Sequence, residues 1–159
     1  LNLKYTVMCL KLKIFIIYDT KHGNTKKVAE LIGEGLNSIE GNAITFRNVE
    51  DFDSNKEQAY DLIIIGSPNH YGKPTKPIKK LIEVLPDSSL KVNSFAVFDT
   101  YMFKDYEKVV KKMEKKINKL IPRLNQVSSG LSIRVAATKG PILDEELPKC
   151  KDFGIKLAK

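Results

Sequence analysis

The chain places a tight polar turn between an apolar run and a stretch with helical periodicity: Thr20, Lys21, His22, Gly23, Asn24 and Thr25. The first N–H groups of a helix lack partners within it, and the helix dipole favours an anion there. Threonine and asparagine side chains add donors, and a glycine lets the backbone approach closely, which suits a phosphate. The same residue types also cap helices routinely. This turn alone therefore leaves phosphate binding and simple capping as two alternatives.

The chain lacks the common phosphate-binding signatures. No G-x-x-x-x-G-K-[ST] run occurs, and the Gly72-Lys73 pair is followed by Pro74. The G-x-G-x-x-G fingerprint of dinucleotide-binding folds is absent as well. A two-component receiver domain needs an aspartate at the end of the third strand, where this chain has Gly66-Ser67-Pro68. These three kinds of phosphate site are therefore excluded.

Two further loops follow apolar runs: GSPNHYGKPT at residues 66–75 and FDTYMF at residues 98–103. Glycine, proline and asparagine predict an ordered turn in the first of them, where His70 and Tyr71 offer flat rings. Tyr101 lies in the second loop. A flat aromatic ligand can be held between such loops by stacking, although a tyrosine also serves simply to cover a loop. The pattern favours a planar ligand and leaves the covering role open.

Five strand-like runs alternate with helical patterns and must position these loops. The strands are predicted near Leu12–Tyr18, Ala43–Asn48, Tyr60–Ser67, Ser94–Thr100 and Ser132–Ala137. The helical periodicities lie near 28–36, 78–85, 104–121 and 145–158, and the polar segment 51–59 is predicted as a helical turn. This alternation predicts an α/β fold with a parallel sheet and helices on both faces. Ligands in such sheets bind beyond the carboxyl ends of the strands.

Length and composition predict one globular domain. The chain has 159 residues, 42% of them hydrophobic and 29% charged. We expect residues 1–11 to be an N-terminal extension, with Met8 as a hypothetical true start, and residues 12–159 to form the domain. The apolar runs are too short to span a membrane, and no signal peptide is visible. Cys9 and Cys150 have no metal-ligand or redox spacing, which favours idle thiols in a reducing cytoplasm and no metal.

The charge indicates an anionic partner or ligand. The chain has 27 basic and 19 acidic residues, a formal net charge of +8. Much of the excess lies in residues 104–121, where an apolar stripe that includes Val109, Met113 and Leu120 leaves the lysines largely on the opposite side. A solvated helix face and a docking site for an acidic protein are both compatible with this pattern. Nucleic acid is disfavoured because no aromatic platform accompanies the lysines.

Four segments together resemble the flavodoxin-like family: YDTKHGNTKKVAELIGEGL, DLIIIGSPNHYGKPT, FAVFDTYM and GPILDEELPKCKDFGIKLA. The resemblance covers about residues 12–158. It implies a three-layer αβα sandwich, a five-stranded parallel sheet in the order 2-1-3-4-5, and one non-covalent FMN. It also implies phosphate contacts from Thr20, Lys21, His22, Gly23, Asn24 and Thr25. Contacts to the isoalloxazine ring fall on Ser67, Pro68, Asn69, His70, Tyr71 and Gly72, and on Asp99, Thr100, Tyr101 and Met102.

The chain departs from the family pattern in three respects. His22 stands where flavodoxins usually have a threonine, and the bulky aromatic of the third-strand loop falls on either His70 or Tyr71. Electron-carrier flavodoxins are typically acidic, whereas this chain has a net charge of +8. No long insertion interrupts the last strand, so the chain resembles the short type.

The resemblance implies an electron-transfer flavoprotein that works with a redox partner protein. We expect that partner to be acidic and to dock near the flavin or on the lysine-rich helix at 104–121. Backbone groups of residues 67–72 would meet the N5 edge of the flavin, with a peptide flip at Asn69 or Gly72. Two alternatives remain: an FMN-dependent oxidoreductase acting on NAD(P)H, a quinone or another small acceptor, and a flavin-free scaffold. No residue is typical of a dedicated catalytic acid, base or nucleophile.

Overall fold

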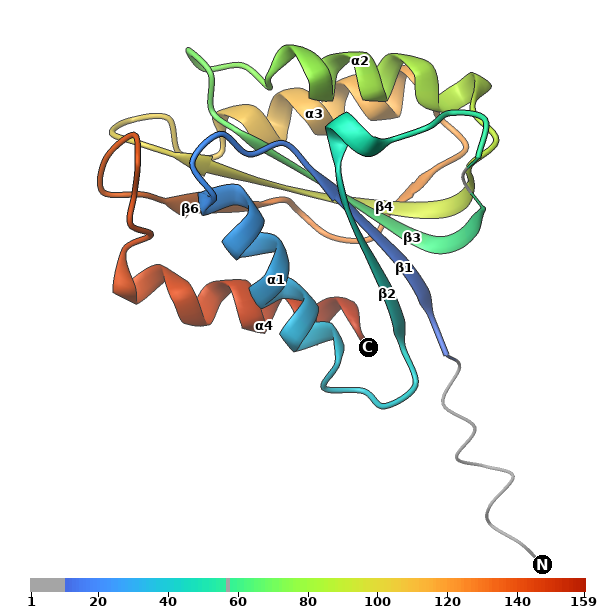
Figure 1. Cartoon of the computed structure of the whole chain (residues 1–159), viewed down its shortest axis with the longest axis horizontal. Coiled ribbons are helices and arrows are strands. Elements are labelled where there is room, and N and C mark those ends of the chain that lie inside the picture. Colours follow the sequence, from blue (N-terminus) through green and yellow to red (C-terminus); the bar gives the residue numbers. More distant parts are fainter. Residues whose placement is uncertain (1–10, 57) are drawn as a thin grey trace, which may run out of the picture.

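The computed structural model describes residues 11–56 and 58–159, in which six strands form one parallel sheet (Figure 1). The order is β2-β1-β3-β4-β5, and β6 also pairs with β4. The strands are β1 (Lys13–Tyr18), β2 (Ala43–Asn48), β3 (Ala59–Pro68), β4 (Lys91–Tyr101), β5 (Asn125–Gln126) and β6 (Leu131–Arg134). Because β5 and β6 pair with the same strand, they together occupy the fifth position. The predicted order 2-1-3-4-5 is confirmed.

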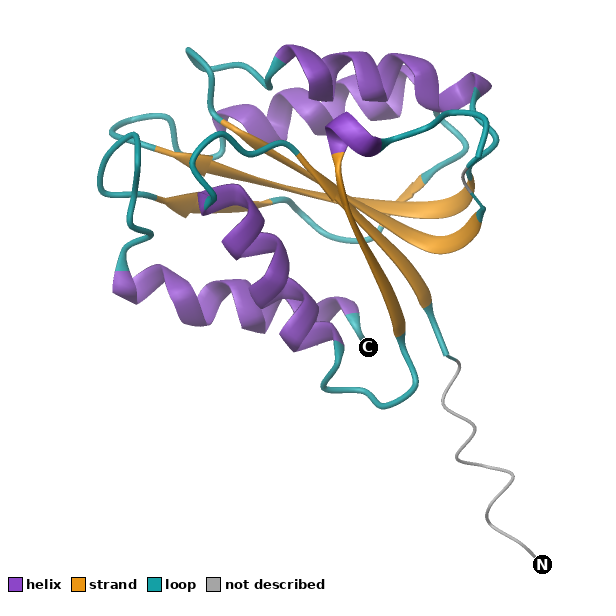
Figure 2. Cartoon of the chain, viewed as in Figure 1, coloured by secondary structure: helices purple, strands orange, loops and turns teal. Residues whose placement is uncertain are grey.

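Helices cover both faces of the sheet and complete the predicted sandwich (Figure 2). One outer layer holds α1 (Asn24–Leu36) and α4 (Leu147–Leu157), and the other holds α2 (Lys76–Val84) and α3 (Lys108–Leu120). Short 3-10 turns lie at η2 (Val49–Asp51), η3 (Leu85–Asp87) and η4 (Asp144–Glu146). Each helix has an apolar stripe that packs against the sheet, as its sequence period requires.

Two apolar cores lie on the two sides of the sheet, and β1 contributes to both. Phe15 and Ile17 face the core beneath α2 and α3, whereas Ile14 and Ile16 face the core beneath α1 and α4. Strand side chains alternate between faces, so a central strand that is covered twice must be apolar at consecutive positions. This explains why β1 and β3 were recognisable from continuous apolar runs.

Several predicted boundaries differ from the structure. The helix predicted from residue 104 begins at Lys108, because Phe103 and Glu107 have left-handed φ angles of 58° and 59° that a continuous helix does not allow. The helical turn predicted at 51–59 is instead the 3-10 turn Val49–Asp51, followed by a loop. Leu120 was placed in the buried stripe of α3, but its side chain is 40% exposed.

The predictions about cysteines and termini fall partly outside the described residues. Cys9, Met8 and most of the expected extension lie there, so the extension stays a prediction. Cys150 is fully buried on α4, as expected of an idle thiol. Burial raises the pKa of the Cys150 thiol to about 12, so this group remains protonated and unreactive at neutral pH.

Candidate functional site

The loops after β1, β3 and β4 meet at the carboxyl edge of the sheet, as predicted. The Asp19 N–H donates to the carbonyl of Gly66 at 3.1 Å, which joins the first loop to the second. The Asn69 N–H donates to the carbonyl of Thr100 at 2.8 Å, which joins the second loop to the end of β4, just before the third loop. The hydroxyls of Thr25 and Thr100 lie 3.0 Å apart in a buried contact that links the start of α1, directly after the first loop, to the end of β4. The three loops therefore form one connected site.

The first loop leaves the N-terminus of α1 open to an anion. Gly23 is the N-cap residue, with a left-handed φ of 91°, and its N–H donates to the hydroxyl of Thr20 at 2.9 Å. Among the residues that the structure describes, no side chain caps α1, and the first turn of the helix contains no acidic residue. The simple-capping alternative for Asn24 and Thr25 is therefore wrong. The N–H groups of the first helical turn remain available to a ligand such as a phosphate.

The side chain of Thr25, a predicted phosphate contact, already has a hydrogen-bond partner within the protein. Its side chain is 2% exposed, and its hydroxyl is paired with that of Thr100. Each hydroxyl retains further hydrogen-bonding capacity. Lys21 and His22, by contrast, are exposed at the tip of the turn. The loop thus presents two basic side chains to solvent, while Thr25 holds it to β4.

A fourth loop, after β6, closes on the first and was missed from the sequence. Gly140 has a φ of 92°, and a Cβ built on it would lie 2.5 Å from Oδ1 of Asn24. The positive φ and this close approach both favour glycine at position 140. The signal was present as Gly140-Pro141 after the last strand, a typical turn pair. The predicted site comprises only the loops after the first, third and fourth strands.

The second loop ends in a two-residue turn whose geometry is well defined. Tyr71 and Gly72 have φ angles of 54° and 78°, the positive pair typical of a type I′ turn. The N–H of His70 donates to the carbonyl of Lys73 at 2.9 Å, and the reverse bond is 3.1 Å. The loop is therefore the ordered turn that its glycine, proline and asparagine residues predicted.

Side chains of this loop divide into structural and exposed groups. The hydroxyl of Ser67, fully buried, donates to the Pro68 carbonyl at 2.9 Å and accepts from the Thr75 N–H at 3.1 Å. Tyr71 is 91% exposed, and its ring meets that of His70 edge to face, with centroids 4.9 Å apart. Ser67 thus shapes the loop, whereas His70 and Tyr71 present aromatic surface.

β4 extends to Tyr101, so Asp99 lies within this strand rather than in the loop predicted at residues 98–103, and its carboxylate is directed into the protein. It is fully buried and accepts hydrogen bonds from the Ser132 hydroxyl at 2.6 Å and from the Val110 N–H at 3.0 Å. Because the carboxylate points inward, only backbone atoms of Asp99 are left for the predicted contact with a flavin ring. Thr100 is held by Thr25, Tyr101 is buried with its ring centroid 5.7 Å from that of Tyr106, and Met102 is half-buried.

We expect Asp99 to make stability depend on pH. Burial raises its pKa to about 7, from 3.8, against the lowering effect of its hydrogen bonds. Between about pH 4 and pH 7, Asp99 therefore keeps its proton in the folded state, whereas it has lost that proton in the unfolded chain. The stabilisation is complete below about pH 4 and declines up to about pH 7, by at most about 1.4 kcal/mol per pH unit.

Urea unfolding of the unaltered chain and of D99N at pH 5, 6, 7 and 8 checks this expectation. The free energy of unfolding should fall between pH 5 and 7 more steeply for the unaltered chain than for D99N, which has no carboxyl to titrate. Parallel pH profiles for the two proteins would contradict the assignment.

Exposed aromatic side chains near the site were only partly foreseen. Phe103 is 79% exposed and Tyr106 is 60% exposed, and both belong to the segment between β4 and α3. Together with Tyr71 they are the three most exposed large apolar side chains among the described residues. Phe103 is the last residue of the FDTYMF stretch but is not among the predicted site residues. Its left-handed φ of 58° belongs to the turn between β4 and α3, which sequence periodicity does not reveal.

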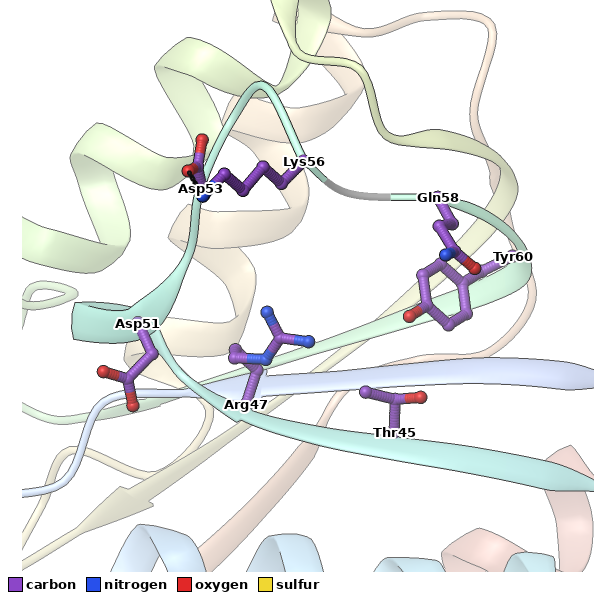
Figure 3. A pocket seen from close by; sticks show the side chains of 7 residues that line it. All are labelled: Thr45, Arg47, Asp51, Asp53, Lys56, Gln58 and Tyr60. Carbon is purple, nitrogen blue, oxygen red and sulfur yellow. Dashed lines mark ion pairs between the residues drawn. The ribbon is translucent and has the colours of Figure 1, made fainter.

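A separate polar hollow lies away from this edge. It has a volume of about 440 Å³ and lies between β2 and the loop before β3 (Figure 3). Its lining residues are Thr45, Arg47, Asp51, Asp53, Lys56, Gln58 and Tyr60. Both charge signs are present, and none of the predicted site residues contributes, so the hollow is distinct from the candidate site.

Residues 11–56 and 58–159 contain neither a metal-binding cluster nor a membrane-spanning helix. No cluster of three or more histidine, cysteine or carboxylate side chains is arranged to hold a metal ion. No helix in these ranges is long and apolar enough to cross a bilayer.

Comparison with known proteins identifies the family. Over 71 residues the chain is 35% identical to a flavodoxin of Aquifex aeolicus (strain VF5), a match that covers 45% of this chain and 38% of that protein. Over 89 residues it is 32% identical to a flavodoxin of Clostridium saccharobutylicum, covering 56% of each. The matched parts therefore span only about half of these relatives or less.

The fold is also similar to solved flavodoxin structures. Oxidised Flavodoxin 2 from Bacillus cereus superposes with a TM-score of 0.73 at 24% identity, over 92% of this chain and 97% of that one. The family model of the flavodoxin domain matches residues 15–132, which is most of the chain. The chain therefore belongs to the flavodoxin domain family.

Proposed function

We propose that the protein binds one FMN at the carboxyl edge of its sheet and transfers electrons. The observation that carries this proposal is the uncapped N-terminus of α1 behind Gly23, which faces the loops after β3 and β4. Backbone N–H groups at a helix start suit a phosphate, and the adjoining aromatic loops suit a flat ring. The donor set of the site thus fits both ends of a flavin mononucleotide.

The residues that would hold FMN come from these loops. The phosphate would contact Thr20, Lys21, His22, Gly23, Asn24 and Thr25. The ring would contact Ser67, Pro68, Asn69, His70, Tyr71 and Gly72, together with Thr100, Tyr101, Met102 and the backbone of Asp99. Phe103 adds an exposed aromatic beside them. When bound, the flavin supplies the redox chemistry, and the protein orients it and adjusts its potential.

The basic side chains of the site should make the reduction potential less negative than in an acidic flavodoxin. Lys21, His22 and Lys73 are exposed in the phosphate and ring loops. A nearby positive charge stabilises a flavin that gains negative charge on reduction, by about 1 kcal/mol at 4 Å in water and more with less screening. Potentiometric titration measures this, and a very low potential for the second electron would contradict it.

FMN binding is the test of the proposed function. The purified chain, freed of bound flavin and titrated with FMN, should become yellow and quench FMN fluorescence with a dissociation constant in the micromolar range or below. A chain that stays colourless and ignores micromolar FMN would contradict the proposal and favour the flavin-free scaffold. Rapid turnover of NADPH with a quinone by the loaded protein would favour the oxidoreductase alternative.

The redox partner is proposed to be an acidic protein of the cytoplasm. Helix α3 has six lysines against one glutamate, and α2, which lies beside it, has three lysines against one glutamate (Figure 1). The two helices are joined by a Lys116–Glu83 ion pair of 2.6 Å. This basic layer adjoins the ring loops, since Lys112 of α3 contacts Gly72. Electron transfer to the partner should therefore slow as ionic strength rises.

A further inference from the structure

The backbone of the turn at residues 70–73 is almost completely engaged in hydrogen bonds. His70 and Lys73 bond each other in both directions. The Gly72 N–H donates to Oδ1 of Asn69 at 2.7 Å, and the Gly72 carbonyl accepts from Nζ of Lys112 at 2.7 Å. Only the N–H and carbonyl of Tyr71 have no partner within the part of the chain that the structure describes. These two groups are therefore the ones left for a bound ring.

Helix α3 supplies the support for this turn. Besides the Lys112 bond, the side-chain amide of Asn69 donates to Oδ2 of Asp105 at 3.0 Å, just before the helix. The stem of Lys108 packs on the turn, because a Cβ built on Gly72 would lie 3.3 Å from Cδ of Lys108. The turn needs such support, since Tyr71 has a left-handed φ of 54°, which is unfavourable for a residue with a side chain.

We propose that Lys112 is a positioning residue for the flavin, an inference that rests on the proposed function. The Gly72 carbonyl and the Lys73 N–H belong to one peptide plane. Rotation of that plane would break both the bond to Lys112 and the bond from Lys73 to the His70 carbonyl. Lys112 thus holds this peptide in one orientation. As a result, the N–H and carbonyl of the neighbouring Tyr71 also keep a fixed orientation. A hydrogen bond from a charged donor is stronger than a neutral one and suits this task.

A matched control is available on the same helix. Lys115 is exposed and makes no bond to the turn, so K115M removes the same charge from α3 without touching the loop. K112M removes the charge and the bond together. K112R keeps both a positive charge and a donor. Differences between K112M and K115M therefore report positioning rather than charge.

The first measurement uses flavin-free protein. Amide hydrogen exchange at Gly72 and Lys73 should be about tenfold faster in K112M than in the unaltered chain, and unchanged in K115M, because local opening becomes easier when a bond is lost. The second measurement is the dissociation constant of FMN. It should rise about three- to tenfold in K112M, because fewer molecules hold the binding-competent turn, and stay near the original value in K115M and K112R.

Equal exchange rates and equal FMN affinities in K112M and K115M would overturn the role of Lys112. If the unaltered chain binds no FMN, the proposed function fails instead. Exchange at Gly72 and Lys73 would then still distinguish a turn held by Lys112 from one that is not.

Discussion

Replacement of Asn24 by aspartate is expected to weaken FMN binding about a hundredfold while leaving the fold intact. Asn24 opens α1 beside the uncapped N–H groups and lies half-buried against Gly140. Aspartate has the same shape but would place a negative charge against the phosphate. Two unit charges 4 Å apart repel by about 4 kcal/mol at an effective dielectric constant of 20, and partial exposure reduces this to roughly 3 kcal/mol. That loss corresponds to the stated factor.

Riboflavin provides the control, because it has the ring of FMN and no phosphate. N24D and the unaltered chain should bind riboflavin equally. Thermal stability should not fall, since an acidic residue in the first turn of a helix is favourable by about 0.3–1 kcal/mol. An equal loss of FMN and riboflavin affinity in N24D, or no loss of either, would place the phosphate elsewhere.

The layers of the fold were predictable from the residues, but the order of the strands was not. Alternating apolar runs and helical periodicities require a parallel sheet between helices. The order 2-1-3-4-5 came from the resemblance, because alternation alone is compatible with several windings. The split of the fifth position into β5 and β6 was missed. β5 consists of the two polar residues Asn125–Gln126, which pair with β4. They do not belong to an apolar run, so the sequence pattern did not predict a strand there.

The candidate site was predictable where it depends on backbone chemistry and less so where it depends on side-chain direction. Gly23 and the Tyr71-Gly72 turn were foreseen because glycine and its neighbours define local geometry. Asp99 was assigned to the ligand edge, whereas its carboxylate points into the protein toward Ser132. β4 continues through Asp99 to Tyr101, and the side chains of a strand alternate between its two faces, so Asp99 faces the layer of α3 rather than the ligand edge.

Gly35 is expected to be the glycine of α1 whose replacement damages the protein most. Helices α1 and α4 cross in direct backbone contact there. A Cβ on Gly35 would overlap the carbonyl oxygen of Lys151 and lie 2.8 Å from the amide nitrogen of Ile155. Backbone atoms cannot rotate aside, so the two helices must separate and part of the apolar core opens. We expect G35A to lower the free energy of unfolding by about 3 kcal/mol, and Tm by roughly 6–12 °C.

Gly33, two residues earlier in the same helix, is the matched control. A Cβ on Gly33 would meet the ring of Phe46 at 2.5 Å, but that side chain is 42% exposed and can move. Alanine is also favoured over glycine inside a helix by about 1 kcal/mol. G33A should therefore unfold within about 1 kcal/mol of the unaltered chain in urea. Because both substitutions add one methyl group to one helix, equal losses in G33A and G35A would refute the close crossing of α1 and α4. A large loss in G35A alone would locate the constraint in the contact between the two helices rather than in α1 itself.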